Sequence, residues 1–300
     1  MPLLKSRLKI LAIFALLAPL AASAEDLSRT ASLEDELRSD VRFLSDSLNR
    51  GRGYGARETL GIGFYIYKSF KDSGLWTRVQ NFSAAGATGR NVIGFTPGFY
   101  DDYIVLATHY DGLGEKEGGY YPCADSNASG VAALLAAARE LGPVRSRTGI
   151  IFVAFDGFNA DMAGSKAFLK EFGSQYKIRT MVNLDILGSS ASPVRKDRPD
   201  YLIALGGSEY RWDLGRLNRS TDLHLVYDYY GSSRFTSLFY NSMSDQKWFL
   251  EKRIPCVMFT SGITMDTNRT TDTADKLDYP VFARRVRLIC LWLAALAGAE

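Results

Sequence analysis

Short apolar runs alternate with helical patterns through most of this chain. Runs such as 103–107 and 149–155 are almost wholly apolar, which is typical of strands buried on both faces. Between them, apolar residues recur every three or four positions, as in amphipathic helices. We predict helices at 33–48, 58–70, 129–141, 161–172, near Trp212, at 245–251 and at 279–297, and strands at 91–94, 103–107, 149–155, 179–186, 201–205, 223–227 and 255–260. This alternation predicts a mostly parallel α/β sheet with helices on both faces.

The N-terminal residues have the layout of a secretory signal peptide. Three basic residues within the first nine positions precede an apolar run at 10–20, and the small residues Ala22-Ser23-Ala24 follow. The apolar run is shorter than the roughly 20 residues that span a bilayer, so a membrane anchor is the less favoured interpretation. We predict cleavage of residues 1–24, export to the periplasm or the cell exterior, and no membrane span in the mature protein. Because no repeat or linker-like stretch follows, residues 25–300 are expected to form a single domain.

The net charge limits the kinds of binding partner, and the cysteine spacing limits the possible disulfides. Without the three basic residues of the leader, the 36 Lys and Arg fall to 33, against 33 Asp and Glu. A formally neutral chain gives no support for binding to nucleic acid or to an anionic membrane. Cys123, Cys256 and Cys290 are spaced too irregularly for a disulfide framework. The last two are expected in the core, and Cys123, although close to Asp125, is also more simply interpreted as a packed residue.

Residues that can bind metals follow several of the predicted strands. The carboxyl ends of strands in an open α/β sheet converge on one crevice, which would gather His109, Asp125, Asp156 and Asp185. His109 with Asp111 two residues later is a pattern in which an imidazole binds a metal and a nearby carboxylate orients it. Asp125 and Asp185 would add two oxygen ligands and leave room for water on zinc. Alternatively, Asp125 caps a helix and Asp185 ends a strand, but the spacing of the set favours a metal site.

Six motifs occur in a fixed order along the chain. They are His109-Tyr110-Asp111, the segment 124–135, Phe155-Asp156-Gly157 with Ala163-Gly164-Ser165 behind it, Asn183-Leu184-Asp185, Ser244-Asp245, and the segment 272–277. As an ordered set they resemble the secreted zinc aminopeptidases of metallopeptidase family twenty-eight, clan MH. The resemblance runs from Arg57 to Leu296. It implies a three-layer α/β/α sandwich with a mixed, mostly parallel central sheet, the fold of zinc exopeptidases.

The resemblance also implies a set of metal ligands. Active members of this family hold two zinc ions that share an aspartate, and a glutamate takes a proton from the bridging water. Matched by motif, the shared aspartate is Asp125, the other ligands of the first zinc are His109 and Asp185, and Asp111 lies beside them. We therefore expect at most one zinc ion, bound to these three residues.

The second half of the implied site has lost its chemistry. The general base falls on Phe158, so no catalytic residue is assigned, and the second-zinc ligands fall on Asn159 and Asn268. Gln246 takes the place of the histidine that usually follows the Ser-Asp motif. Asp161 and Asp266 are possible substitutes, although a first helical turn and a solvated loop explain them more simply. Loss of a general base alone commonly costs about 10² to 10⁴ in rate.

Three functional interpretations stay open at this point. The first is a catalytically inactive or strongly impaired homologue that binds a peptide-like or other small ligand in the crevice. The alternative is a single-metal hydrolase, a peptidase or amidase, with zinc on His109, Asp125 and Asp185. The third is a subunit of a complex, with tyrosines such as Tyr229 and Tyr230 at an interface. The sequence leaves the ligand and the oligomeric state undetermined.

Overall fold

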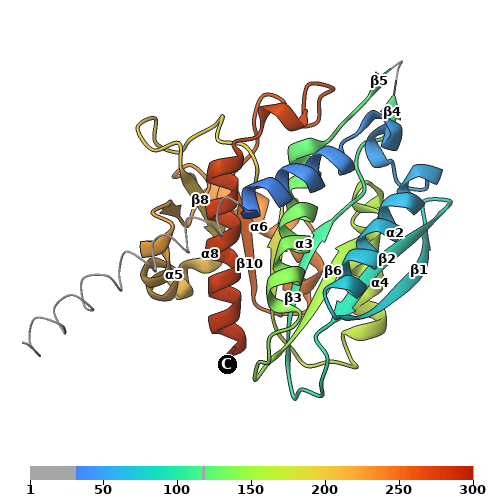
Figure 1. The fold of residues 1–300 in the computed structure, drawn as a ribbon, viewed down its shortest axis with the longest axis horizontal. Coiled ribbons are helices and arrows are strands. Elements are labelled where there is room, and N and C mark those ends of the chain that lie inside the picture. The colour runs from blue at the N-terminus through green and yellow to red at the C-terminus, as the bar shows by residue number, and fades with distance from the viewer. Residues whose placement is uncertain (1–31, 117–118, 300) are drawn as a thin grey trace, which may run out of the picture.

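An eight-stranded sheet runs through the molecule and separates two layers of helices (Figure 1). The computed structural model describes residues 32–116 and 119–299, so the predicted signal peptide lies outside the described residues. The strand order is β1-β2-β6-β3-β7-β10-β8-β9. The strands are β1 (Trp76–Ala84), β2 (Ala87–Phe95), β3 (Tyr103–His109), β6 (Gly149–Phe155), β7 (Ile178–Leu184), β8 (Tyr201–Leu205), β9 (His224–Val226) and β10 (Cys256–Thr260). A separate two-stranded sheet contains β4 (Glu115–Lys116) and β5 (Gly119–Tyr120).

The centre of the sheet is parallel, and the sheet as a whole is mixed. Strand β3 pairs in parallel with β6 and β7, and β7 pairs in parallel with β10. Strands β1, β2 and β8 join by antiparallel pairing. Because the central strands are parallel, His109 at the end of β3 lies directly beside Phe155 at the end of β6. This confirms the predicted mostly parallel sheet. It also places His109 at the carboxyl end of the central strands, where the candidate site was expected.

Helices cover both faces of the sheet. One face packs against the helix at 32–44, α2 (Arg57–Asp72), α3 (Ser129–Leu141) and α8 (Tyr279–Ala297), and the other packs against α4 (Ala163–Phe172) and α7 (Gln246–Glu251). Helix α5 (Arg211–Leu217) lies against α8, and α6 (Ser233–Ser242) against α7. Short helical turns occur at Ser47–Arg52, Ala124–Ala128, Phe158–Ala160, Gly207–Tyr210, Asn218–Ser220 and Ala274–Lys276.

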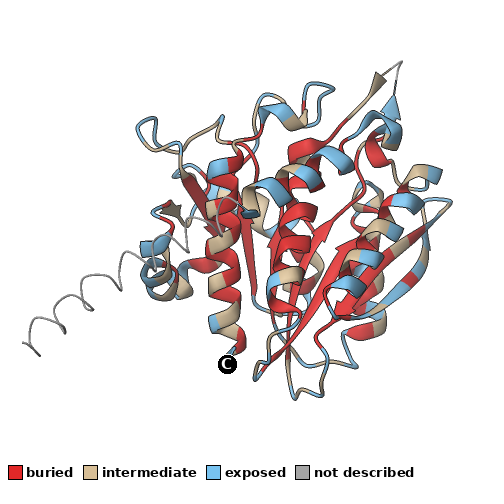
Figure 2. Cartoon of the chain, in the orientation of Figure 1, coloured by how far each residue is buried: buried red, intermediate tan, exposed pale blue. Residues whose placement is uncertain are grey.

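The most buried helix is α3, which Figure 2 shows almost wholly red beside the central strands. Its sequence is apolar around nearly the whole circumference, as expected of a helix enclosed by other elements. It packs on the sheet, and α2 and α8 flank it in the same helical layer (Figure 1). The predicted bounds of α3, β6, β8 and α8 are confirmed. The three cysteines are buried and unpaired, as expected.

Besides the short strands β4 and β5 and the short helical turns, β1 and α6 were not predicted. Strand β1 buries only the polar Gln80, and α6 buries no residue, so neither contains a run of buried apolar residues. Within residues 32–116 and 119–299, no helix has both the length and the apolar content to cross a bilayer.

Candidate functional site

His109 is the last residue of β3, and its side chain is buried with 3% of its surface exposed. The ring nitrogen Nδ1 lies 2.9 Å from the main-chain carbonyl oxygen of Asp111. A carbonyl only accepts, so Nδ1 carries the hydrogen and donates it. The other nitrogen, Nε2, is buried without a hydrogen-bond partner and lies 3.8 Å from Oδ1 of Asp185, which directly follows β7. A histidine whose Nδ1 donates to a main-chain carbonyl in this way can bind a metal ion through Nε2.

Three buried carboxylates surround this imidazole. Burial by itself lowers the pKa of His109, but Asp185, Asp111 and Asp245 together outweigh it and raise the pKa to about 9. Asp245 is fully buried, and neither of its carboxylate oxygens has a hydrogen-bond partner in the described residues. Burial raises the pKa of Asp245 to about 7, against the opposing effect of His109. Sequence reasoning quoted Ser244-Asp245 as a motif but did not assign Asp245 to the site.

Asp125 does not join His109 and Asp185. It lies in the turn Ala124–Ala128, where its carboxylate accepts hydrogen bonds from the amides of Gly188, at 2.7 Å, and Ser189, at 3.2 Å. Burial and then the nearby charge of Asp272 raise the pKa of Asp125 to about 7. The carboxylate therefore holds the 188–189 loop, since two main-chain amides there provide the donors that a buried carboxylate requires.

Phe158, at the position matched to the general base, covers the imidazole of His109. The two rings are stacked, with centroids 3.8 Å apart and planes 10° from parallel. The amide of Phe158 donates to Oδ1 of Asp111 at 2.9 Å, and the amide of Asn159 donates to Oδ2 at 3.2 Å. Asp111 thus anchors the 158–160 turn through its carboxylate and fixes the imidazole through its carbonyl.

The residues at the matched second-zinc positions have other bonding partners. The side-chain amide of Asn159 donates to Oδ2 of Asp111 at 3.3 Å and to the carbonyl of Gly112 at 3.0 Å. Gln246 is fully buried; its Nε2 donates to the carbonyls of Phe239 and Tyr240, and its Oε1 accepts from Asn183. Both side chains are therefore fixed by hydrogen bonds within the protein.

The remaining candidates lie apart from His109. Asn268 is exposed, in a loop where its φ is +61°. Asp161 lies 3.5 Å from Nζ of Lys247, and Asp266 lies 2.6 Å from Nζ of Lys276. The first helical turn expected for Asp161 is wrong, because α4 begins at Ala163 and Asp161 has a φ of +58°. Asp266 lies in a loop, as expected.

The donor set does not fit a pair of zinc ions. Among the residues that the structure describes, no three His, Cys, Asp or Glu side chains come together to hold a metal ion. His109 and Asp185 provide two neighbouring donors, whereas a structural zinc site needs four protein ligands and a catalytic one three. No chemical step through a metal follows from this arrangement.

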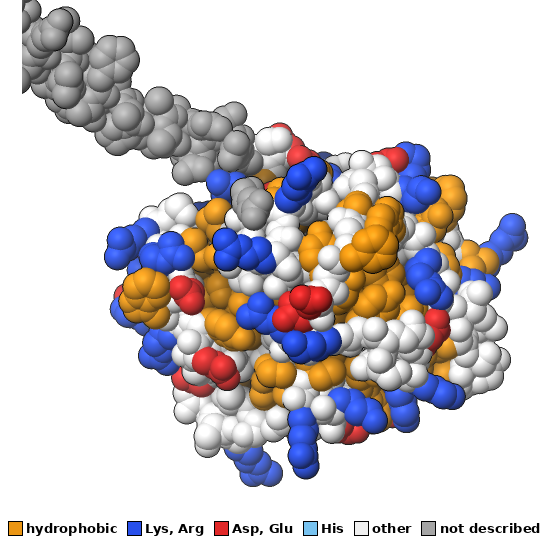
Figure 3. All heavy atoms as spheres, turned by 90° about the horizontal axis from the view of Figure 1, so that it is seen from below, with side chains coloured by type: hydrophobic (Ala, Val, Ile, Leu, Met, Phe, Trp, Pro, Cys, Tyr) orange, Lys and Arg blue, Asp and Glu red, His pale blue; other side chains and the backbone are white. Residues whose placement is uncertain are grey.

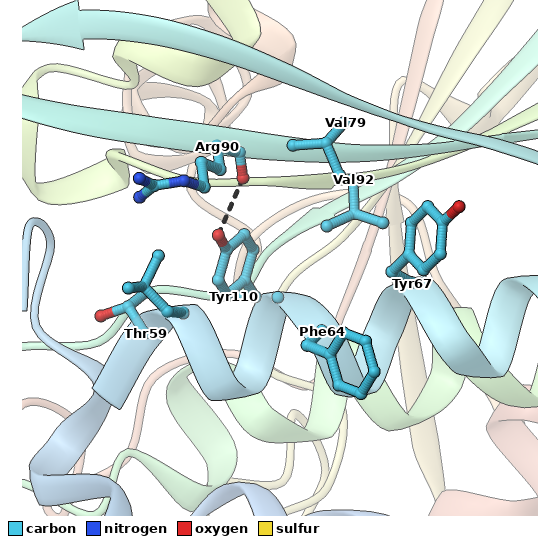
Figure 4. A pocket seen from close by; sticks show the side chains of 9 residues that line it. Thr59, Phe64, Tyr67, Val79, Arg90, Val92 and Tyr110 are labelled. Atoms are coloured by element: carbon cyan, nitrogen blue, oxygen red, sulfur yellow. Dashed lines mark hydrogen bonds between the residues drawn. The ribbon is translucent and has the colours of Figure 1, made fainter. Parts of the chain in front are cut away.

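Two cavities flank the site without containing His109. One of about 460 Å³ is bordered by Asn159, Tyr54, Gly112 and the ion-paired Arg50 and Glu115. The other, of about 280 Å³, lies between α2 and the first two strands. Figure 4 shows Tyr110 in this second cavity, donating a hydrogen bond from its hydroxyl to the carbonyl of Arg90. Neither His109 nor Asp185 lines either cavity.

One buried cation supports the loops around the site and was missed by the sequence reasoning. Arg52 is fully buried, and its guanidinium donates to the main-chain carbonyls of Leu44, Tyr110, Pro122 and Cys123. Arginine is common on protein surfaces, so nothing in its local sequence indicates this role.

A mixed sheet with helices on both faces, and with His and Asp residues at the ends of its central parallel strands, defines a protein of the zinc-exopeptidase class. The model of peptidase family M28 matches residues 91–293, and the chain belongs to that family. A curated relative, the uncharacterized protein YfbL of Escherichia coli strain K12, is 25% identical over 84% of this chain and 85% of its own length.

Solved structures share the fold at low sequence identity. The LapA aminopeptidase of Legionella pneumophila superposes with a TM-score of 0.73 at 15% identity, covering 92% of this chain and 75% of its own. A zinc aminopeptidase from Bacillus subtilis gives 0.71 at 14% identity, covering 88% of this chain and 95% of its own. The glutaminyl cyclase of Porphyromonas gingivalis gives 0.66 at 15% identity, covering 88% and 98%.

Proposed function

We propose that this chain is a member of peptidase family M28 that has lost aminopeptidase catalysis, or retains it only in strongly impaired form, and that binds a peptide-like or other small ligand. The observation that carries the proposal is the stacking of Phe158 on His109. An aromatic ring there supplies no group that can take a proton from water, and it covers one face of the imidazole. The side-chain amides of Asn159 and Gln246 donate hydrogen bonds to main-chain carbonyls, which supports the same interpretation.

The ligand of such a protein would enter beside the 158–160 turn. The cavity of about 460 Å³ there is bordered by the ion-paired Arg50 and Glu115 and by the main-chain groups of Gly112 and Gly114. Charged side chains of both signs at the border of this cavity suit a zwitterionic, peptide-like molecule. Export to the periplasm or the cell exterior, inferred from the N-terminal segment, would place the protein where such peptides occur.

A second candidate function is a hydrolase that uses one zinc ion. It is favoured by one observation, the unpartnered Nε2 of His109 beside Asp185. It is weakened by Asp125, whose carboxylate is already bound to two amides.

Metal content and hydrolysis distinguish the two candidates. The purified mature protein is exposed to zinc, dialysed and analysed for metal, and is assayed on aminoacyl p-nitroanilides, with His109→Ala as the control. We expect less than one equivalent of zinc and no hydrolysis above the metal-free background. Phe158→Glu combined with Asn159→Glu should also fail to give full activity, because position 268 still lacks an imidazole. Chelator-sensitive turnover that disappears in His109→Ala would overturn the proposal in favour of the single-zinc hydrolase.

A further inference from the structure

A cavity of about 810 Å³ lies between α4 and α7, away from His109. We call it the lysine groove, because Lys166, Lys170, Lys177 and Lys252 line it and Lys247 borders it through Trp248. The whole sequence contains only twelve lysines among its 36 basic residues. Five of them gather here, in a chain whose charges otherwise nearly balance.

The position of the groove makes it independent of the candidate active site. Lys177 directly precedes β7, and Ile254 lies two residues before β10. Both strands run parallel to the central strands, so the groove reaches the end of the sheet opposite to His109. A seven-residue strand separates the two ends by roughly 20 Å. Figure 3, which views this end, shows Lys and Arg side chains around the face and hydrophobic side chains exposed among them.

Three lysines of the groove lack counter-ions, whereas Lys247 at its border is paired with Asp161. Lys170, Lys177 and Lys252 are exposed and form no ion pair with a described residue, whereas Lys68 and Lys276 elsewhere do. Glu251 is the one acidic residue that lines the groove. Like charges held within about 8 Å repel each other appreciably at physiological ionic strength. An anionic ligand would relieve that repulsion.

Trp248 provides the second observation. The ammonium groups of Lys166 and Lys247 lie 4.4 Å and 4.3 Å from the centre of its rings, so the indole fixes two of the cations by cation–π contact. Its Nε1 is buried and has no hydrogen-bond partner in the described residues. A buried N–H group of this kind ordinarily has an acceptor, and a ligand oxygen would supply one.

The floor of the groove is apolar. Leu169 is buried, and Tyr176, Ile178 and Ile254 pack on the core cluster beneath. A ligand that fits the groove therefore combines an anionic group with an apolar body. A phosphate monoester carries nearly two negative charges at neutral pH, which matches several unpaired ammonium groups better than one carboxylate does.

We propose that the lysine groove binds a phosphate-bearing amphiphile, with the phosphate among Lys170, Lys177 and Lys252 and the apolar chain on Leu169, Ile178 and Ile254. The same chemistry is offered by a free alkyl phosphate and by lipid in a membrane. The cavity between two helices favours the free molecule.

Calorimetric titration of the mature protein with dodecyl phosphate, below its micellar concentration, tests the proposal. We expect saturable binding that is at least tenfold weaker for inorganic phosphate and for the uncharged dodecyl maltoside. The double variant Lys170→Ser/Lys252→Ser should weaken dodecyl phosphate binding tenfold or more, and Trp248→Phe, which keeps an aromatic ring without the N–H, about threefold.

The matched control is Lys68→Ser/Lys71→Ser on α2, which removes the same charge from the other layer of helices. Equal weakening by both double variants would overturn the proposal, since it would indicate only the general effect of net charge. Equal binding of dodecyl maltoside, or binding confined to phosphatidylglycerol vesicles, would also overturn it. All four lysines are exposed, so the variants should remain folded, which circular dichroism checks.

Discussion

Two parts of the candidate site differ in how their side chains are bonded; we call them the retained half and the altered half, after the motif match made from the sequence. In the retained half, His109 and Asp245 are buried with unpartnered atoms. In the altered half, Asn159 and Gln246 have their side-chain groups bound to neighbouring residues. Buried polar atoms without partners are costly, so the unpartnered atoms of His109 and Asp245 reduce the stability of this region. The side chains of Asn159 and Gln246 belong to the hydrogen-bonded framework.

A substitution of Gln246 in the altered half should therefore give the largest loss of stability. Gln246→Leu keeps the volume but leaves the carbonyls of Phe239 and Tyr240 without their donor and Asn183 without one acceptor. We expect the free energy of unfolding in urea to fall by about 3 kcal/mol. Asn268→Gly, at an exposed position with positive φ, is the control and should change it little. Equal losses in the two variants would contradict the comparison.

The retained half should make stability depend on pH. The pKa of Asp245 is raised to about 7 in the folded protein, so its contribution is complete below about pH 4 and is lost as the pH rises toward 7. The pKa of His109 is raised to about 9, so its contribution is complete below 6.5 and is lost as the pH rises through 9. With a chelator present, we expect the free energy of unfolding to fall by about 2 kcal/mol between pH 4 and pH 9.

Two variants separate these contributions. Asp245→Asn should flatten the lower part of the pH profile, and His109→Gln the upper part. A wild-type profile that rises over this range would show that the carboxylates around His109 do not act as described.

Exposing the imidazole should have the smallest effect on stability. Phe158→Ala removes a stacked ring that is half-buried, which should cost about 1 kcal/mol. The same change should increase the rate at which diethylpyrocarbonate modifies His109, measured by mass spectrometry, while His224 in β9 serves as the internal reference. An unchanged rate would mean that Phe158 does not shield the ring.

Sequence patterns predicted the interior of the fold well and its margins poorly. Strand β6 is apolar throughout and α3 is apolar from Val131 to Ala138, and both were located to the residue. Edge strand β1 and helix α6 were missed because most of their residues face solvent or neighbouring loops. Such elements are short or mostly polar, so the apolar positions in them are too few to identify a strand or helix.

The sequence predicted only part of the candidate site, because motif spacing does not specify the direction of the side chains. Motif order located His109 and Asp185 at the ends of neighbouring strands, and the structure brings them together. Spacing could not reveal that the 124–128 turn directs Asp125 toward Gly188 and Ser189. Side-chain direction in an irregular turn depends on backbone angles that residue types do not specify. Nor does spacing show that Asp245, the N-cap residue of α7 and far along the chain, is near the imidazole.

Arg52 has a consequence for how the protein opens. Its guanidinium joins carbonyls of Leu44, Tyr110 and the 122–123 segment, which are far apart in the chain. Separating any one of these segments breaks one or two hydrogen bonds from the same charged guanidinium and disturbs the others. They therefore form one cooperative unit, so their amide protons would exchange with solvent in a single opening event rather than piecemeal. Proteolytic loss of the helix at 32–44 would then loosen the loop that follows His109. The two segments are more than sixty residues apart in the sequence.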